Sequence, residues 1–141
     1  MGAGRTKARL AFKKKHMDKH TKQWVDDTLK QAVNTLIDRE LFDDPLIEAK
    51  PEWALPPTLV IGKARPRGNP HDFVWFLCGD APVITLPAEA AHRPRDAARH
   101  FAYQWQLQLG KDDNASESDT EKAEALYQLT ELDELWQQNT Y

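Results

Sequence analysis

The sequence predicts an α+β fold, in which a small antiparallel sheet of about three strands packs against an N-terminal helix and two C-terminal helices. Three observations predict it. Apolar residues recur every three or four positions towards both ends of the chain, apolar stretches flank a cluster of turn residues in the middle, and 141 residues suffice for one domain with one core. Because a sheet this small must bury a face, we expect helices on one face of it.

The first helix is predicted over about 20–41. Its apolar stripe has spacings of three and four residues and consists of Trp24, Val25, Leu29, Ala32, Val33, Leu36 and Ile37. The following stretch FDDPLIEAKPEW is predicted to end the helix and is assigned no strand. Asp44 precedes Pro45, and proline disfavours helical geometry in the residue before it and has no amide hydrogen to donate.

The middle of the chain predicts a β-hairpin that joins about 57–65 to 71–78, because the turn-rich PRGNP lies between two apolar segments. Phe73 to Leu77 are apolar without interruption, which indicates a strand covered on both faces or an aromatic-rich central strand. VITLP at 83–87 is predicted as a short third strand that completes an antiparallel meander.

Two more helices are predicted after the strands. HRPRDAARHFAYQWQLQLG has Pro94 in its first turn, Gly110 at its end, and one apolar face made of Ala98, Phe101, Ala102, Trp105 and Leu109. After a polar loop at 111–118, Ser118 and Glu121 match a capping box that begins a helix of about 119–137. This helix either extends the core or packs on another subunit, so a homodimer through it is one expectation.

The charge is distributed unevenly along the chain. Residues 1–23 carry +7, whereas the other 118 residues carry −10, and nine acidic residues lie in 111–141 beside only Lys111 and Lys122. We therefore expect a basic, flexible arm over 1–18 and a single domain over 19–141. Cys78 is the only cysteine, and no signal peptide or membrane-length apolar run is recognisable, so we predict a cytoplasmic protein without a disulfide.

Two motifs in order resemble an uncharacterised bacterial family, a domain of unknown function. In that family a tryptophan-bearing strand ends in Gly-Asp-x-Pro, and a helix with His-Phe-x-x-x-Trp-Gln-Leu follows. The matching residues are Trp75, Gly79, Asp80, Pro82, His100, Phe101, Trp105, Gln106 and Leu107. The resemblance covers roughly 53–110 and a helix near Trp24. It implies a small cytosolic bacterial protein and transfers no catalytic residue, because the family has no assigned activity.

Asp80 and His100 are the candidates for catalysis. A carboxylate at a strand end could act as a general base, and Asp96, His100 and Gln104 align on one helix flank, with Arg99 nearby. The interpretation that we favour is structural. Gly79 supplies a backbone conformation that other residues avoid, and Asp80 caps its own turn by accepting a backbone amide.

The remaining polar residues give weaker signals. His16 and His20 have helical i, i+4 spacing but no further metal ligand nearby, so we predict no metal site and no cofactor. Cys78 is expected to be an inert buried thiol. Trp24, Trp75 and Trp105 are expected in the core, whereas Trp53 and Trp136 are alternatively surface anchors at an interface.

The leading functional hypothesis is a non-enzymatic protein-interaction module of an immunity or adaptor type, with an acidic binding face. The alternative is a small ligand-binding or hydrolase-like protein that uses Asp80 and His100. A weaker alternative is a nucleic-acid-associated factor that binds phosphates through the arm residues Arg5, Lys7, Arg9, Lys13, Lys14 and Lys15. The acidic remainder of the chain argues against nucleic acid, and an upstream start, with Met17 as the true initiator, would also explain the arm.

Overall fold

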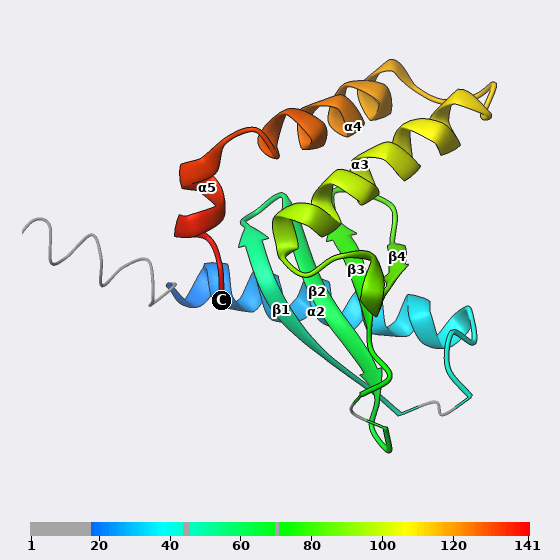
Figure 1. Ribbon diagram of the computed structural model, residues 1–141, viewed down its shortest axis with the longest axis vertical. Coiled ribbons are helices and arrows are strands. Elements are labelled where there is room, and N and C mark those ends of the chain that lie inside the picture. Colours follow the sequence, from blue (N-terminus) through cyan, green and yellow to red (C-terminus); the bar gives the residue numbers. More distant parts are fainter. Residues whose placement is uncertain (1–17, 44–45, 70) are drawn as a thin grey trace, which may run out of the picture.

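The computed structural model describes residues 18–43, 46–69 and 71–141. Its four-stranded antiparallel sheet has the order β1-β2-β3-β4, with helices on both faces (Figure 1). The strands are β1 (Ile47–Leu55), β2 (Leu59–Pro66), β3 (Val74–Gly79) and β4 (Ile84–Pro87). The helices are α2 (Lys19–Asp38), α3 (Pro94–Gly110), α4 (Glu117–Leu129) and α5 (Asp133–Gln138), and a single 3-10 turn, Ala88–Ala90, precedes α3. The predicted α+β class is confirmed, with four strands in place of about three.

The two faces of the sheet are covered by different helices. Trp75 and Leu77 of β3 belong to the core cluster under α3, whereas Phe76 and Cys78 belong to the cluster under α2. All four side chains are buried. The expectation of helices on a single face is therefore wrong. The uninterrupted apolar run of β3 requires cover on both sides, as buried strands generally do.

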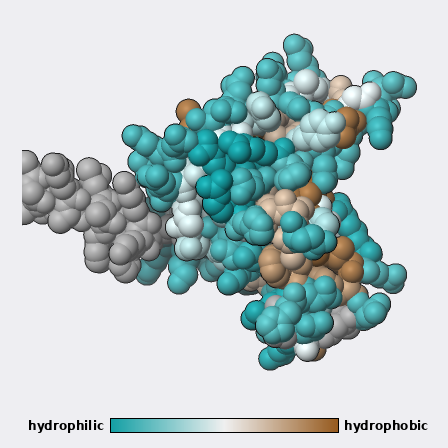
Figure 2. Space-filling view, viewed as in Figure 1, coloured by the Kyte–Doolittle hydropathy of each residue, from teal (hydrophilic) through white to brown (hydrophobic). Residues whose placement is uncertain are grey.

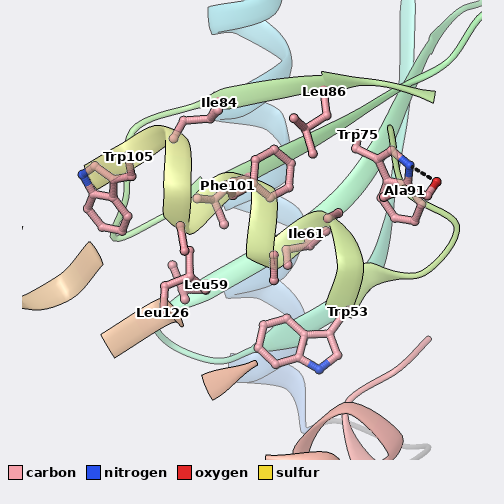
Figure 3. Close-up of a cluster of buried hydrophobic side chains, with 14 of the residues drawn as sticks. Trp53, Leu59, Ile61, Trp75, Ile84, Leu86, Ala91, Phe101, Trp105 and Leu126 are labelled. Atoms are coloured by element: carbon pink, nitrogen blue, oxygen red, sulfur yellow. Dashed lines mark hydrogen bonds between the residues drawn. The ribbon is translucent and has the colours of Figure 1, made fainter. Parts of the chain in front are cut away.

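The larger cluster lies between the sheet and α3 (Figure 3). Phe101 and Trp105 project from α3 towards residues of the strands, which include Leu59, Ile61, Ile84 and Leu86. Trp75 lies at the margin of this cluster, and its indole nitrogen donates a hydrogen bond of 3.0 Å to the carbonyl oxygen of Ala91. This bond ties the chain before α3 to the central strand.

Strand β1 was not predicted. It pairs with β2 from Ile47 opposite Pro66 to Leu55 opposite Leu59, and its register shifts between Pro51 and Trp53. A proline and alternating charges argue against a strand when only the sequence is read. Here β1 is an edge strand with an irregularity beside Pro51, and such positions tolerate proline.

Helix α2 begins and ends at local signals. The Asp18 carboxylate accepts a hydrogen bond of 2.7 Å from the Thr21 amide, which caps the first turn. The helix ends at Asp38, three residues before the predicted end, and Glu40 then adopts a left-handed conformation with φ of 52°. The predicted stop at Asp44 and Pro45 lies outside the described residues.

The predicted third helix is two helices. α4 is capped by Ser116, whose hydroxyl oxygen accepts from the Asp119 amide at 3.0 Å, so the predicted cap at Ser118 is wrong by two residues. The helical conformation is interrupted between α4 and α5. At this junction Arg95 of α3 donates to the Thr130 carbonyl oxygen at 2.6 Å and pairs with Asp133 at 2.6 Å. A side chain from α3 thus holds the junction of the two helices.

The break directs α5 back onto the sheet. Trp136 stacks on Trp53 with ring centroids 4.2 Å apart, and the two are 7% and 0% exposed. The chain end then lies along β1, because the Ala54 amide donates to the Asn139 carbonyl oxygen and the Tyr141 amide to that of Glu52. The alternative that Trp53 and Trp136 are surface anchors is therefore wrong.

Gly79 provides a test of the sheet geometry. Its φ is +107°, and a Cβ atom there would lie 2.4 Å from the Thr58 carbonyl oxygen. We predict that Gly79→Ala lowers the free energy of unfolding by about 1–3 kcal/mol. The measurement is urea denaturation, with tryptophan fluorescence as the signal of unfolding.

The matched control is Gly110→Ala at the end of α3, where a Cβ would meet nothing within 4 Å. This change should leave stability unchanged or raise it by up to about 1 kcal/mol. Equal stabilities for the two variants would contradict the strain assigned to Gly79.

Candidate functional site

Asp80 lies in the turn after β3, at the strand end that the sequence indicated. Its amide donates to the Thr58 carbonyl oxygen at 2.7 Å, and its carboxylate accepts a hydrogen bond of 3.1 Å from the Lys122 ammonium of α4. The expected cap of its own turn is not formed, because among the described residues no backbone amide donates to this carboxylate, which bonds to a distant helix instead. The expectation for Gly79 is confirmed by its positive φ.

His100 and Arg99 lie on the exposed side of α3. Asp96, one turn earlier, is held by Arg93 through hydrogen bonds of 3.1 and 3.2 Å, which lower the pKa of Asp96 below its usual value. Within the described residues, Asp80 bonds to Lys122, and no hydrogen bond or ion pair joins it to His100. The proposed catalytic pair is thus not assembled by hydrogen bonding, and a catalytic role for either residue stays a prediction.

Cys78 points into the core under α2 and is 2% exposed. Burial raises the pKa of its thiol to about 12, so the thiol is neutral at ordinary pH. This environment is that of a packing residue, since a reactive cysteine needs an accessible thiolate.

The described part of the chain holds no group of three or more His, Cys, Asp or Glu side chains that could bind a metal ion. His16 and the candidate arm residues, Arg5, Lys7, Arg9, Lys13, Lys14 and Lys15, lie outside the described residues. Among the described helices, none combines the length and the apolar character needed to cross a membrane.

An acidic surface covers the outer side of α4. Its glutamates Glu117, Glu121 and Glu124 are exposed and lie on the helix side opposite the buried Ala123 and Leu126. We call these three glutamates, with the exposed Tyr127 and Leu132, the acidic α4 surface. On the face shown in Figure 2, most of the surface over α4 and α5 is hydrophilic, whereas hydrophobic side chains gather lower, over the strands.

The basic residues that contact α4 and its C-terminal end do not pair with these glutamates. Lys122, the one basic residue within α4, pairs with Asp80, and Arg95 of α3 pairs with Asp133. Among the described residues, none of the three glutamates forms an ion pair. Because like charges three or four positions apart on a helix repel each other, the surface carries an electrostatic cost of a few tenths of a kcal/mol for each pair, in the range of ~0.2–0.5.

Comparison with known proteins identifies the family. The model of a domain of unknown function, DUF4826, matches residues 18–136. The chain belongs to this family. The DUF4826 match begins at Asp18, which caps α2, and ends at Trp136 within α5, which stacks on Trp53, so it covers the sheet and the other helices. No curated protein and no solved structure matches the chain.

The sequence indicated the acidic segment but not its geometry. The spacing of four and three between Glu117, Glu121 and Glu124 is a signal for one helix side, and it could have identified these residues. The pairing of Asp80 with Lys122 had no local signal, because the two residues are 42 positions apart.

The Asp80–Lys122 pair is exposed, with side-chain exposures of 58% and 41%. We predict that Asp80→Asn lowers the free energy of unfolding by less than about 1 kcal/mol. In a double-mutant cycle with Lys122→Met, the coupling should fall towards zero in 1 M salt, where the Debye length is about 3 Å. A salt-independent loss several times larger would instead indicate a structural role of the carboxylate within its turn.

The Cys78 thiol should not react with Ellman's reagent at pH 8 in the folded protein and should react fully in urea, because only unfolding exposes it. The folded pKa is raised from 9.0 to about 12, so the related stability is intact below about pH 9 and is lost as the pH rises towards 12. Wild type should therefore lose stability more steeply than Cys78→Ala in this window, by up to about 1.4 kcal/mol per pH unit. Parallel pH profiles, or fast labelling of the folded protein, would contradict burial of the thiol.

Proposed function

We propose that this domain is a non-enzymatic protein-interaction module, of an immunity or adaptor type, and that the acidic α4 surface binds a basic partner protein. The observation that carries the proposal is the stripe of Glu117, Glu121 and Glu124, which lies on the solvent side of α4 without a basic partner among the described residues. A basic partner would relieve the repulsion within this stripe.

Apolar side chains that are exposed on α4 and just after it support a protein as the partner. Tyr127, which follows the buried Leu126, is 47% exposed, and Leu132, in the junction after α4, is 53% exposed. Aromatic and aliphatic side chains provide the contact area of protein interfaces, whereas surrounding charges steer association and set specificity. Binding should therefore be fast and sensitive to salt, since exposed charges are screened at high ionic strength.

The support under the surface also suits recognition. Ala123 and Leu126 of α4 are buried against the core, and Arg95 donates a hydrogen bond to the carbonyl oxygen at the C-terminal end of α4. A surface held by a packed helix loses little conformational freedom when it binds, which favours affinity.

The test is affinity capture from a native lysate with the full chain and with the triple variant Glu117→Gln, Glu121→Gln and Glu124→Gln. We expect wild type to retain a stoichiometric basic protein at low salt and to release it at high salt, and the triple variant to retain at least about tenfold less. The retained protein is then purified, and its direct binding to both forms is measured by calorimetry.

The matched control changes three exposed acidic residues elsewhere, Asp38→Asn, Asp72→Asn and Glu89→Gln, and therefore removes the same net charge. It should bind as wild type does. Equal loss in both variants would assign the effect to net charge alone. The absence of any stoichiometric partner at low salt would overturn the proposed function.

A further inference from the structure

A second polar region lies on the α3 side of the sheet, beyond the part that the core cluster fills. Along β2, Leu59 and Ile61 are buried in the cluster, and Lys63 and Arg65 follow at the same period of two. In the sheet register, Lys63 lies opposite Lys50 on β1 and opposite Trp75 on β3, and Arg65 lies opposite Glu48. Charged side chains of neighbouring strands therefore converge on one face.

These side chains surround a cavity of about 240 Å³. Its walls are formed by residues of β1, of β2 and of the segment just before β3, namely Glu48, Ala49, Lys50, Lys63, Arg65 and Phe73. We call it the β-sheet pocket. Its base is rigid, since Lys63 lies between paired strands and Phe73 packs edge-on against the buried Trp75, with ring centroids 6.3 Å apart.

Lys63 is held in place without having its hydrogen-bonding capacity filled. Its ammonium nitrogen lies 4.7 Å from the ring centroids of both Phe73 and Trp75, and its side chain is only 29% exposed. The nearest carboxylate oxygen of the described chain, that of Glu52, is 3.7 Å away, which is beyond hydrogen-bond distance. The aromatic rings stabilise the charge but accept no conventional hydrogen bond, so the three N–H donors are available to an anion.

Cations outnumber carboxylates around the pocket. Lys50 and Lys63 share Glu52, at 3.6 and 3.7 Å, and Arg65 and Arg67 share Glu48, at 3.2 and 3.8 Å. Four positive and two negative charges leave an excess of two positive charges, in a chain whose residues after 23 carry −10. The local excess thus matches a small dianion, and the paired glutamates disfavour a larger polyanion.

We propose that the β-sheet pocket binds a small phosphate monoester, with the phosphate between Lys50, Lys63 and Arg65 and the organic part against Phe73. A phosphate monoester carries close to two negative charges at neutral pH and has three terminal oxygens that accept hydrogen bonds. Phe73 supplies an apolar wall next to the charged groups, as small-molecule sites commonly do. This site involves neither the acidic α4 surface nor the proposed protein partner.

To test the proposal, the full chain is titrated with phenyl phosphate, and its amide signals are monitored by two-dimensional NMR at each step. We expect saturable shifts at the amides of 48–50, 63–65 and 73. Lys63→Met, which keeps the apolar stem, should raise Kd at least about tenfold, whereas Glu52→Gln should lower Kd because it removes a repelling charge. A general loss of structure would raise Kd in both variants, so opposite changes in Kd would exclude it. Thermal melting of each variant verifies that it is folded.

The control Lys111→Met removes the same charge from an exposed position after α3 and should leave Kd unchanged. Shifts that do not saturate, that are unchanged in Lys63→Met, or that are confined to residues 1–17 would overturn the proposal. Inorganic phosphate that binds as tightly as phenyl phosphate would overturn the assignment to a monoester.

Discussion

The burial of β3 on both faces is the constraint on which the rest of the structure depends. Trp75 and Leu77 need cover on one side, and Phe76 and Cys78 on the other, so neither α2 nor α3 alone can complete the core. Full burial of each large apolar side chain contributes roughly 1.5–3 kcal/mol. The strand must also end sharply, and it ends at Gly79, where the backbone of Thr58 approaches too closely for any side chain.

The second organising contact closes the far edge of the sheet. β1 is an edge strand, and exposed edges can pair with other chains. Trp53 on this strand stacks with Trp136, and the last residues of the chain then pair with its outer edge around Glu52 and Ala54. Arg95 makes this possible, because its bonds to Thr130 and Asp133 fix the turn between α4 and α5. One arginine on α3 thus stabilises the turn that brings the chain end to β1.

The parts of the fold that the sequence predicts are those with local signals. The apolar periodicity of α2 and α3, and the turn residues between β2 and β3, act within a few positions of each other. The sequence does not predict β1, because Pro51 argues against a strand unless that strand is known to lie at the edge of a sheet. The end of α4 is not predicted either, because it depends on a hydrogen bond from Arg95 to the carbonyl oxygen of Thr130, 35 positions later in the chain. The pairing of Asp80 with Lys122 and the β-sheet pocket are not predictable for the same reason. Both depend on how segments far apart in the sequence are placed next to each other.

Strand β2 explains how one face of the sheet contributes both to the core and to the proposed β-sheet pocket. Its side chains alternate strictly, so Leu59, Ile61, Lys63 and Arg65 all project towards the α3 side. The core cluster includes the first two of these residues and not the last two. The character of this face therefore changes from apolar to charged where the cover of the cluster ends, with no change in backbone geometry. Because Lys63 also contacts the ring of the buried Trp75, the position of its charge is set by the same packing that stabilises the core. An ammonium group placed in this way is preorganised by the fold, and its geometry should persist for as long as β3 stays buried.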